Sequence, residues 1–553
     1  MKLNFNKQKN TFFLAFFYLV VFSIGLISYQ DYGIHIEEKF HRLNGLYWLN
    51  HIADIFGLVD IQNTIQIKIK EISDYTLSPV SKYNKYGIVL DLPVAIMEIL
   101  FDFKRPNEIY YLKHFLSFVI FLLSSIFFSR ILFDRFQNYF LTFFGLFLYL
   151  SSPRILGDSF LYKDVLYLSF FTINLFFFLK TLKNFNYKNL IFFSFFTALS
   201  INLRIFSILI PFIFFFMVIL KSFYKRNIKY DLFKILFYFV LTFLFLYIIW
   251  PYLWLSPIVN FLELFSSLKN DLINTKILFA NSFISNRALP DTYILNWIII
   301  STPTLQIILF FLGYLFCLYR LGKRYLNLKN NTIYNDLWRG NNEETDFVFF
   351  IFFTFFYLFF IITNAPLYNG WRLVYFFNVL IVYFSVIFLN LVINKFRKNK
   401  LLTLSFFGLA IITVIININS IINIHPFQSI YFNNFASKKA KDYYEGDYYG
   451  LGTKHFFEKI LNDDKRNLIK VAVASHTPIQ RGLEALPGNS IKKFEIIGQE
   501  YQYADYIYKN NISEVDIRLN KKYEVPENFS KIYEFKVNNL VIYEMYKSKD
   551  INK

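Results

Sequence analysis

The sequence predicts an all-α polytopic membrane protein with a small C-terminal α/β domain, and three observations carry this prediction. Of the 553 residues, 55% are hydrophobic and 22% aromatic, and the mean hydropathy is +0.37. Only 18% are charged, against about a quarter in ordinary soluble domains. The apolar residues gather into long runs, and the composition changes abruptly after His425. A cytosolic multidomain protein and a disordered chain are therefore excluded.

About eleven apolar runs are candidates for membrane-spanning helices, because about 20 apolar residues cross the hydrocarbon core. They fall at about 11–28, 110–131, 138–152, 164–181, 187–203, 205–222, 232–250, 298–319, 345–363, 373–394 and 401–421. The run at 138–152 is short and the two runs beside Arg204 are nearly continuous, so either could shift the count. The segment 86–103 carries Asp91, Glu98 and Asp102. We interpret it as an interfacial helix, because carboxylates are costly on a lipid-facing span.

The distribution of Lys and Arg predicts the orientation of these spans. Basic residues concentrate at one end of the runs, whereas the short loops at the other end keep only Arg154, Lys163, Arg204 and Arg372. The N-terminus is therefore predicted to be cytoplasmic. The long loops at about 29–109 and 251–297 and the C-terminal domain are then expected outside. The first run lacks a small-residue cleavage site and is interpreted as an uncleaved anchor.

The net charge of +19 does not indicate a nucleic-acid partner. Residues 425–553 hold 20 Lys and Arg against 17 Asp and Glu, so 16 of the 19 surplus charges belong to the part with the apolar runs. The single cysteine, Cys317, excludes a disulfide or a Cys-based metal site within one chain. A Walker-type loop and a dinucleotide glycine pattern are both missing from the sequence, which disfavours ATP-driven and nucleotide-sugar mechanisms.

The chain divides into a transmembrane part, residues 1–425, and an α/β domain, residues 426–553. In the second part, alternating apolar residues at 469–475 and on both sides of Asn538-Asn539 predict a strand and a hairpin, and 452–462 predicts a helix. Small domains of this length commonly fold on their own core.

Charged residues near the outer hydrocarbon boundary are the candidate functional residues. They are Asp31, His35, Glu37, Glu38 and His41 after the first span, Arg154, Asp158, Lys163 and Asp164 in the second short loop, and Arg204 and Arg372 beyond them. A carboxylate can deprotonate an acceptor hydroxyl while Arg and Lys neutralise a departing phosphate, so this set suits transfer of a group from a lipid phosphate.

Each group also has a structural interpretation. The acidic cluster could be a solvated helix start, and Arg154, Arg204 and Arg372 could be interfacial anchors. Asp158 could be a turn residue, and Lys163 with Asp164 a helix-start ion pair. The spacing of acids and imidazoles after the first span is specific to no metal, so we predict no cofactor and leave a divalent ion as an alternative.

Several motifs resemble a known family in their order along the chain. They are Ile36-Glu-Glu-Lys-Phe-His41, the stretch Ser152 to Asp164, Leu289-Pro-Asp-Thr-Tyr293, Ser301-Thr-Pro303, Leu367-Tyr-Asn-Gly-Trp-Arg372, His425 to Asn433 and Gly446-Asp-Tyr-Tyr-Gly450. Together they are similar to the GT-C superfamily of membrane glycosyltransferases, in particular to protein O-mannosyltransferases and the aminoarabinose transferases of lipid A (glycosyltransferase family 39-like).

The resemblance implies an inverting glycosyltransferase that uses a polyprenyl-phosphate sugar on the outer face of the membrane. It places Glu37 where the family has its catalytic Asp. The longer side chain leaves Asp31 and Glu38 as alternative bases. The expected substrate-binding residues are His41, Arg154, Asp158, Lys163, Arg204 and Arg372.

We therefore predict transfer of a monosaccharide to a hydroxyl of a lipid, glycan or protein. The scarcity of cysteine and the bias toward Asn, Lys, Ile and Phe favour a bacterial plasma membrane. Two alternatives stay open: a transporter or flippase of lipid-linked intermediates, and an inactive relative that serves as a scaffold.

Overall fold

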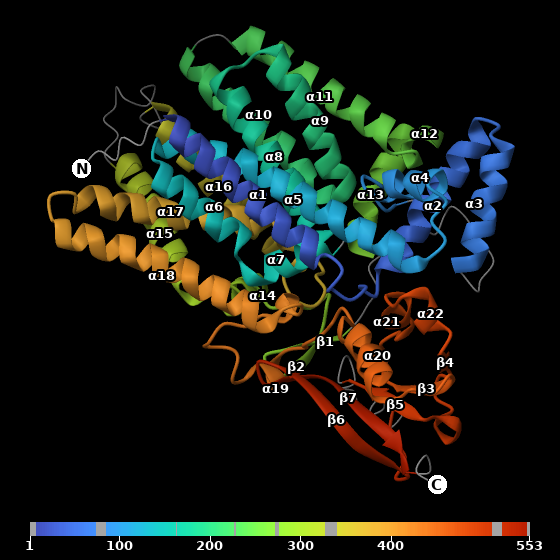
Figure 1. The fold of residues 1–553 in the computed structure, drawn as a ribbon. Helices are drawn as coiled ribbons and strands as arrows, with labels where there is room; N and C mark the ends of the chain where they lie inside the picture. Colours follow the sequence, from blue (N-terminus) through green and yellow to red (C-terminus); the bar gives the residue numbers. More distant parts are fainter. Residues whose placement is uncertain are drawn as a thin grey trace.

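A computed structural model describes residues 7–72, 85–161, 163–225, 228–270, 276–326, 340–510 and 523–549. A bundle of helices forms the larger part of the protein, and a small sheet with its own helices lies below one end of the bundle (Figure 1). Tyr162 and most of the predicted basic loop before 340 lie outside the described residues.

A helix occupies each apolar run that the sequence predicts. These helices are α1 (Lys7–Ser28), α5 (Pro106–Phe136), α6 (Tyr139–Leu150), α8 (Asp164–Lys183), α9 (Tyr187–Leu203), α10 (Leu209–Lys225), α11 (Ile228–Ile249), α15 (Thr304–Leu326), α16 (Gly340–Ile362), α17 (Phe377–Lys395) and α18 (Lys400–Ile424). Among the described residues, seven helices are long and apolar enough to span a membrane, or eight if α6 and the bent helix after it form one span. The protein is thus a multi-pass membrane protein, and the span count of eleven stays a prediction.

Two predicted spans are interrupted. The run at 138–152 ends at Leu150, and α7 (Pro153–Phe160) continues it after a bend of 60°. Pro153 stands at the first position of α7, where its missing N–H costs nothing. The run at 298–319 is split between α14 (Tyr293–Ser301) and α15 at Thr302-Pro303. Both interruptions bring polar loops toward the predicted outer boundary.

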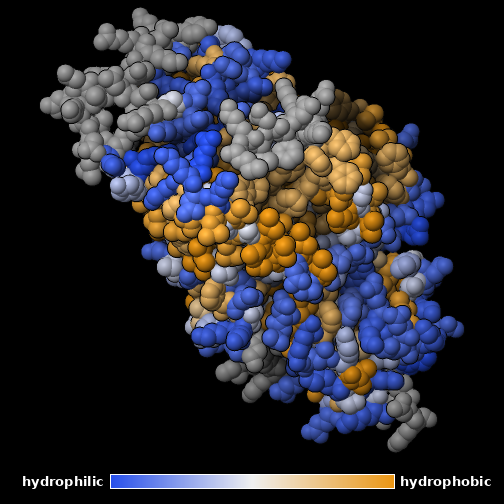
Figure 2. Space-filling model, turned by 60° about the vertical axis from the view of Figure 1, so that its left-hand side comes forward, coloured by the Kyte–Doolittle hydropathy of each residue, from blue (hydrophilic) through white to orange (hydrophobic). Residues whose placement is uncertain are grey.

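The bundle has a buried centre and an apolar outer surface. In α8, 89% of the spanning segment lies inside the protein, and in α17 72%, whereas in α18 only 17% does. α5 and α9 pack against α8, and α15 packs against α17. Figure 2 shows an apolar band across the molecule between hydrophilic surfaces, as expected for lipid-facing helices.

The described residues between 38 and 100 include three helices at one end of the bundle: α2 (Glu38–Ile55), α3 (Val59–Ile72) and α4 (Asp91–Leu100). The predicted interfacial helix corresponds to α4, but two of its carboxylates are buried rather than facing the boundary. Glu98 pairs with Arg42 of α2 at 2.5 Å, and Asp91 lies among polar partners from α2 and α5. Pairing with the buried cations Arg42 and Lys113 offsets part of the desolvation cost of these acids.

The second long loop contains α12 (Tyr252–Leu255), α13 (Pro257–Asn270) and a short hairpin of β1 (Lys276–Phe279) and β2 (Ser282–Ser285). Phe279 forms an isolated bridge with Tyr444, so this hairpin adds to the segment that follows α18. That segment includes η4 (Gln428–Ile430) and α19 (Ala440–Tyr443). Asn433 bonds the carbonyls of Ile299 and Thr302, so residues just after the predicted boundary at 425 pack on the bundle.

The C-terminal domain is a mixed five-stranded sheet in the order β4-β3-β5-β7-β6. Its elements are α20 (Gly452–Asp463), β3 (Ile469–Ala474), α21 (Gln480–Glu484), α22 (Gly488–Ile491), β4 (Phe494–Ile496), β5 (Tyr506–Lys509), β6 (Phe529–Val537) and β7 (Leu540–Ser548). β3 pairs in parallel with β4 and β5, and β7 is antiparallel to β5 and β6. The predicted helix, strand and hairpin are present, and Asn538 and Asn539 both adopt the positive φ of a type I′ turn.

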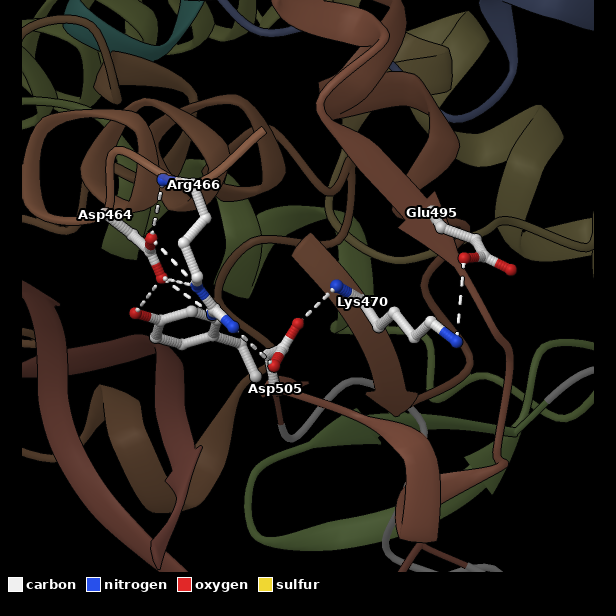
Figure 3. A network of polar contacts seen from close by, with 6 residues as sticks. Asp464, Arg466, Lys470, Glu495 and Asp505 are labelled. Carbon is white, nitrogen blue, oxygen red and sulfur yellow. Dashed lines mark hydrogen bonds and ion pairs between the residues drawn. The ribbon is translucent and has the colours of Figure 1, made fainter. Parts of the chain in front are cut away.

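Ion pairs fix the amino ends of the parallel strands (Figure 3). Arg466 bonds Asp464 and, at 2.9 Å, Asp505, whose second oxygen accepts the N–H of Lys470. The carboxyl ends of these strands face the bundle. Thr477, just after β3, lies against Gly450, and Gly450 lies against Ile36. The carboxyl ends of the strands therefore approach the acidic loop after α1.

Candidate active site

The carboxylate of Glu37 and the guanidinium of Arg372 meet in a two-pronged ion pair. Arg372 Nη2 lies 2.7 Å from Glu37 Oε1, and Nη1 lies 3.2 Å from Oε2. Glu37 precedes α2 and keeps 40% of its side chain exposed, whereas Arg372 begins the 3₁₀ turn η3 (Arg372–Val374) and is buried. Burial alone would raise the pKa of Glu37, but the charge of Arg372 lowers it below its ordinary value.

Aromatic rings hold the Arg372 guanidinium in place. The rings of Tyr368, Tyr448 and Tyr449 lie between 5.0 and 5.7 Å from its central carbon. Such cation–π contacts orient a cation without neutralising it. Gly370 adopts a φ of 76°, which lets the chain turn sharply just before Arg372.

A second carboxylate links Arg372 to Arg204. Asp164, the first residue of α8, forms an ion pair with Arg204 through Oδ1, and its Oδ2 lies 3.8 Å from Arg372 Nη1. Four charges from four distant segments thus form one chain, Glu37, Arg372, Asp164 and Arg204. The structural interpretation of Asp164 was a helix-start ion pair with Lys163, but the structure pairs Asp164 with the two guanidinium groups instead.

Lys163 adds a third cation beside this chain of charges. It is buried, and its ammonium lies 4.7 Å from the centre of the Tyr86 ring. Burial and the charge of Arg204 lower the pKa of Lys163 to about 8. Its backbone has a φ of 96°, a conformation that costs a non-glycine residue on the order of 1–3 kcal/mol. Strain of this kind is common at functional sites.

A buried acid and two histidine side chains form hydrogen bonds that fix the loop that carries Glu37. Glu38 Oε1 accepts the N–H of His35 at 2.9 Å and a hydrogen bond from His114 Nε2 at 2.9 Å. His35 Nδ1 in turn accepts the N–H of Glu37 at 2.8 Å. Glu38 therefore acts on Glu37 through His35. Burial opposes ionisation of Glu38, but His114 lowers its pKa.

His41 belongs to a neighbouring buried cluster. Its Nδ1 lies 3.2 Å from Asp91 Oδ2, and Lys113 Nζ lies 3.3 Å from Asp91 Oδ1. Burial and the charge of Lys163 lower the pKa of His41 to about 4, so its imidazole is neutral near pH 7. Lys163 thus lies within electrostatic reach of this cluster as well as of Arg204.

Arg154 and Asp158 of α7 lie on the other side of Arg372. Arg154 stacks over the Trp297 ring at 5.4 Å and, together with Arg372, lines a small hollow. Asp158 Oδ2 accepts hydrogen bonds from Tyr375 at 2.5 Å and from Tyr449 at 3.2 Å. Tyr449 thus touches both Asp158 and Arg372.

Asp31 faces elsewhere. Its carboxylate lies 2.9 Å from His425 Nε2 at the end of α18, and its backbone carbonyl accepts a hydrogen bond from Lys454. These contacts join the loop after α1 to α18 and α20. Of the three acids predicted as candidate bases, Glu37 contacts the cations, Glu38 supports the loop, and Asp31 ties the loop to the C-terminal domain.

Sequence reasoning did not single out the tyrosines around Arg372 or the buried His114. Tyr448 and Tyr449 stand in the Gly446-Asp-Tyr-Tyr-Gly450 motif, and their repeated aromatic pair was the available signal. His114 lies inside an apolar run, where an ionisable residue is itself a sign of a functional or paired position.

The part of the chain that the structure describes contains no group of three or more His, Cys, Asp or Glu side chains arranged to hold a metal ion. Asp31, one of the four residues considered for a divalent ion, pairs with His425, and the presence or absence of a divalent ion stays a prediction.

Comparisons with known proteins identify no relative by sequence. No protein-family model matches the chain, and the search of curated proteins finds no significant match. Among solved structures, the apo oligosaccharyltransferase of Archaeoglobus fulgidus aligns with a TM-score of 0.41 and 11% identity, over 77% of this chain and 62% of that one. The aligned region is thus less than two thirds of the archaeal chain.

Proposed function

We propose that the protein is a membrane glycosyltransferase that moves a monosaccharide from a polyprenyl-phosphate donor to a hydroxyl of a lipid, glycan or protein. The reaction inverts the anomeric carbon and takes place on the outer face of a bacterial plasma membrane. What supports this proposal most is the chain of charges that runs from Glu37 through Arg372 and Asp164 to Arg204. It agrees with the resemblance of the motifs to GT-C enzymes.

The residues divide the work of the reaction. Glu37 takes the proton of the acceptor hydroxyl, and the acceptor oxygen forms a bond to the anomeric carbon. The bond from that carbon to the phosphate oxygen breaks with its electron pair on the phosphate. Arg372, Arg204 and Lys163 stabilise the negative charge that grows there. The polyprenyl phosphate leaves through the lipid, in which its tail stays embedded.

The ion pair between Glu37 and Arg372 gives this reaction an order. While Arg372 holds the carboxylate, the low pKa of Glu37 makes it a weak base. A donor phosphate competes for the same guanidinium, because planar Arg binds phosphate and carboxylate in the same two-pronged manner. Binding of the donor then releases Glu37 and raises its basicity. Donor binding precedes activation of the acceptor.

The test uses the full-length protein in lipid vesicles with a radiolabelled polyprenyl-phosphate sugar and a membrane extract as acceptor. Glu37→Gln is expected to reduce transfer by at least about 100-fold, the usual contribution of a general base. Its affinity for donor is expected to stay or rise, because Arg372 is freed. Glu458→Gln, an exposed acid on α20, serves as the control and keeps full activity.

Full transfer by Glu37→Gln would remove Glu37 from the role of base. No release of sugar by the wild-type protein from any donor in a panel of polyprenyl-phosphate sugars would contradict the proposed function itself.

A transporter of lipid-linked intermediates stays the second candidate, because α6 and α7 form a broken helix that carries Arg154 and Asp158. Discontinuous helices with charged residues line the binding sites of many transporters. Movement of labelled lipid across vesicles without cleavage of the sugar would favour this candidate over the enzyme.

A further inference from the structure

A hollow with space of about 190 Å³ lies between the ends of three helices of the bundle. Its lining includes Asp134 of α5, Phe176, Lys180 and Lys183 of α8, and Thr345 of α16. A single water needs only about 10–15 Å³ of such space, so the hollow can hold a group of many atoms.

This hollow lies at the membrane boundary opposite to the candidate active site. α8 begins at Asp164, which belongs to the chain of charges, and ends at Lys183 in the lining of the hollow. Its 20 residues, at about 1.5 Å each, give a length of about 30 Å, which is the thickness of the hydrocarbon core. Lys180 and Lys183 therefore stand at the level of lipid headgroups. The predicted orientation makes this the cytoplasmic side.

The cations next to the hollow have acidic partners, whereas those in its lining do not. Arg135 and Asp346 each directly follow a lining residue, and Asp346 pairs with both Arg135 and Arg320 at 2.7 and 2.8 Å. In the part of the chain that the structure describes, no acceptor forms an ion pair or hydrogen bond with the ammonium of Lys180 or Lys183. An anion from outside the chain can therefore serve as their counter-ion.

The lining combines charged groups with an aromatic surface. Two lysines against the one carboxylate of Asp134 leave a net charge of +1. The Lys180 ammonium lies 5.7 Å from the centre of the Phe176 ring, and this ring packs against Phe127 of α5 at 5.3 Å. A cation–π contact leaves the positive charge available to an anion. A phosphate group joined to apolar chains matches both parts of this lining.

We propose that the hollow binds the headgroup of a glycerophospholipid with one negative charge, such as phosphatidylglycerol. The phosphate lies between the ammonium groups of Lys180 and Lys183, and the hydroxyls of the headgroup donate to the Asp134 carboxylate. The acyl chains follow the aromatic surface of Phe127 and Phe176. Basic pockets between transmembrane helices on the cytoplasmic side bind anionic headgroups in this manner. The inference does not depend on the proposed function.

The test measures equilibrium lipid binding to the full-length protein in detergent by native mass spectrometry. The probes are phosphatidylglycerol, phosphatidylethanolamine and phosphatidic acid with identical acyl chains. The wild-type protein is expected to bind phosphatidylglycerol about five-fold or more tightly than phosphatidylethanolamine, because each lysine near a net negative headgroup contributes a factor of that order. Phosphatidic acid is expected to bind less tightly than phosphatidylglycerol, because Asp134 repels its second negative charge and it lacks the glycerol hydroxyls.

Lys180→Gln/Lys183→Gln is the decisive variant, because neither ammonium has an ion-pair partner in the described chain whose loss would destabilise the fold. It is expected to keep the melting temperature and the affinity for phosphatidylethanolamine, and to lose the preference for phosphatidylglycerol. Lys398→Gln/Lys400→Gln, at exposed positions beside the turn between α17 and α18, removes the same charge and is expected to keep the preference. Asp134→Asn is expected to bind phosphatidic acid as tightly as phosphatidylglycerol.

Four other results would overturn the proposal or a defined part of it. Equal binding of phosphatidylglycerol and phosphatidylethanolamine by the wild-type protein overturns the preference for an anionic lipid. An equal loss of preference in Lys398→Gln/Lys400→Gln assigns it to general surface charge rather than to the hollow. Displacement of phosphatidylglycerol by excess inorganic phosphate makes a soluble anion the occupant. Weaker binding of phosphatidic acid that persists in Asp134→Asn overturns the role of that carboxylate.

Discussion

The carboxylate of Glu37 and the guanidinium of Arg372, 335 positions apart in the chain, share two hydrogen bonds of 2.7 and 3.2 Å. A carboxylate in such a pair is well placed but weakly basic, and a guanidinium in such a pair is not free to bind phosphate. In the resting site, Glu37 and Arg372 therefore occupy each other's binding groups. Under the proposed function, the phosphate of the donor replaces Glu37 as the anionic partner of Arg372.

Replacing Arg372 by Gln is expected to change the pH profile as well as the rate. The charge of Arg372 lowers the pKa of Glu37 against the effect of burial. Without that charge the pKa rises, so the deprotonated base is lost at a higher pH. The acid limb of kcat/KM, measured with labelled donor, is expected to shift upward, and the donor KM to rise about 10-fold or more.

Arg105→Gln is the control for this variant, because its exposed side chain pairs locally with Glu108. An acid limb that stays in place in Arg372→Gln would mean that Glu37 is not the titrating base.

Because of Lys163, kcat/KM for the donor is expected to decrease at alkaline pH. Its pKa is lowered to about 8, so its positive charge fades as the pH rises from 7 to 9. Since a phosphate binds the charged form, kcat/KM for the donor is expected to fall through pH 8. Lys163→Arg is expected to abolish this fall, because a guanidinium stays charged throughout the range. An identical alkaline limb in both proteins would assign the titration to another group.

Much of the fold could be predicted from local patterns. Apolar runs gave the helices of the bundle, and period-two alternation around Asn538-Asn539 gave the β6–β7 hairpin. The strands β4 and β5 are only three and four residues long. Sequences so short carry little periodicity, and their pairing with β3 rather than their own pattern defines them.

The membership of the site could be predicted only in part. Basic residues are scarce in the predicted outer loops. The few that occur there, Arg154, Lys163, Arg204 and Arg372, were for this reason predicted to be functional. The partners of these cations depend on tertiary packing over hundreds of residues. Asp31 lies six positions before Glu37, yet the turn through Gly33, which sits against the backbone of Leu451, directs it to His425 instead.

The buried pair of Asp91 and Lys113 is expected to be structural rather than catalytic. Asp91→Asn removes the carboxylate 3.3 Å from the Lys113 ammonium, and breaking a buried pair costs about 3–5 kcal/mol. The double variant Asp91→Asn/Lys113→Met is expected to recover most of the melting temperature in detergent, because both charges are then gone. Asp463→Asn, which breaks an exposed contact with Lys459, is the control with little effect. A double variant less stable than Asp91→Asn would contradict this assignment.

The ion pairs at the amino ends of the parallel strands are expected to lose their stabilising effect in acid. The hydrogen bonds from Arg466 lower the pKa of Asp464 to about 2, from an ordinary value of 3.8. A carboxyl group with a lowered folded-state pKa stabilises the fold above its unfolded pKa, and this stabilisation is lost as the pH falls from 4 toward 2. The protection factors of the β3 and β5 amides are therefore expected to fall over that range, as measured by hydrogen exchange in the full-length protein and corrected for the intrinsic exchange rate at each pH.

In Arg466→Ala the protection factors are expected to be low already at pH 5, with little further change on acidification. Lys470→Ala, which removes only the exposed 3.9 Å contact with Glu495, is expected to behave as the wild type. Acid-dependent exchange that persists in Arg466→Ala would show that another carboxylate controls the acid response of this edge.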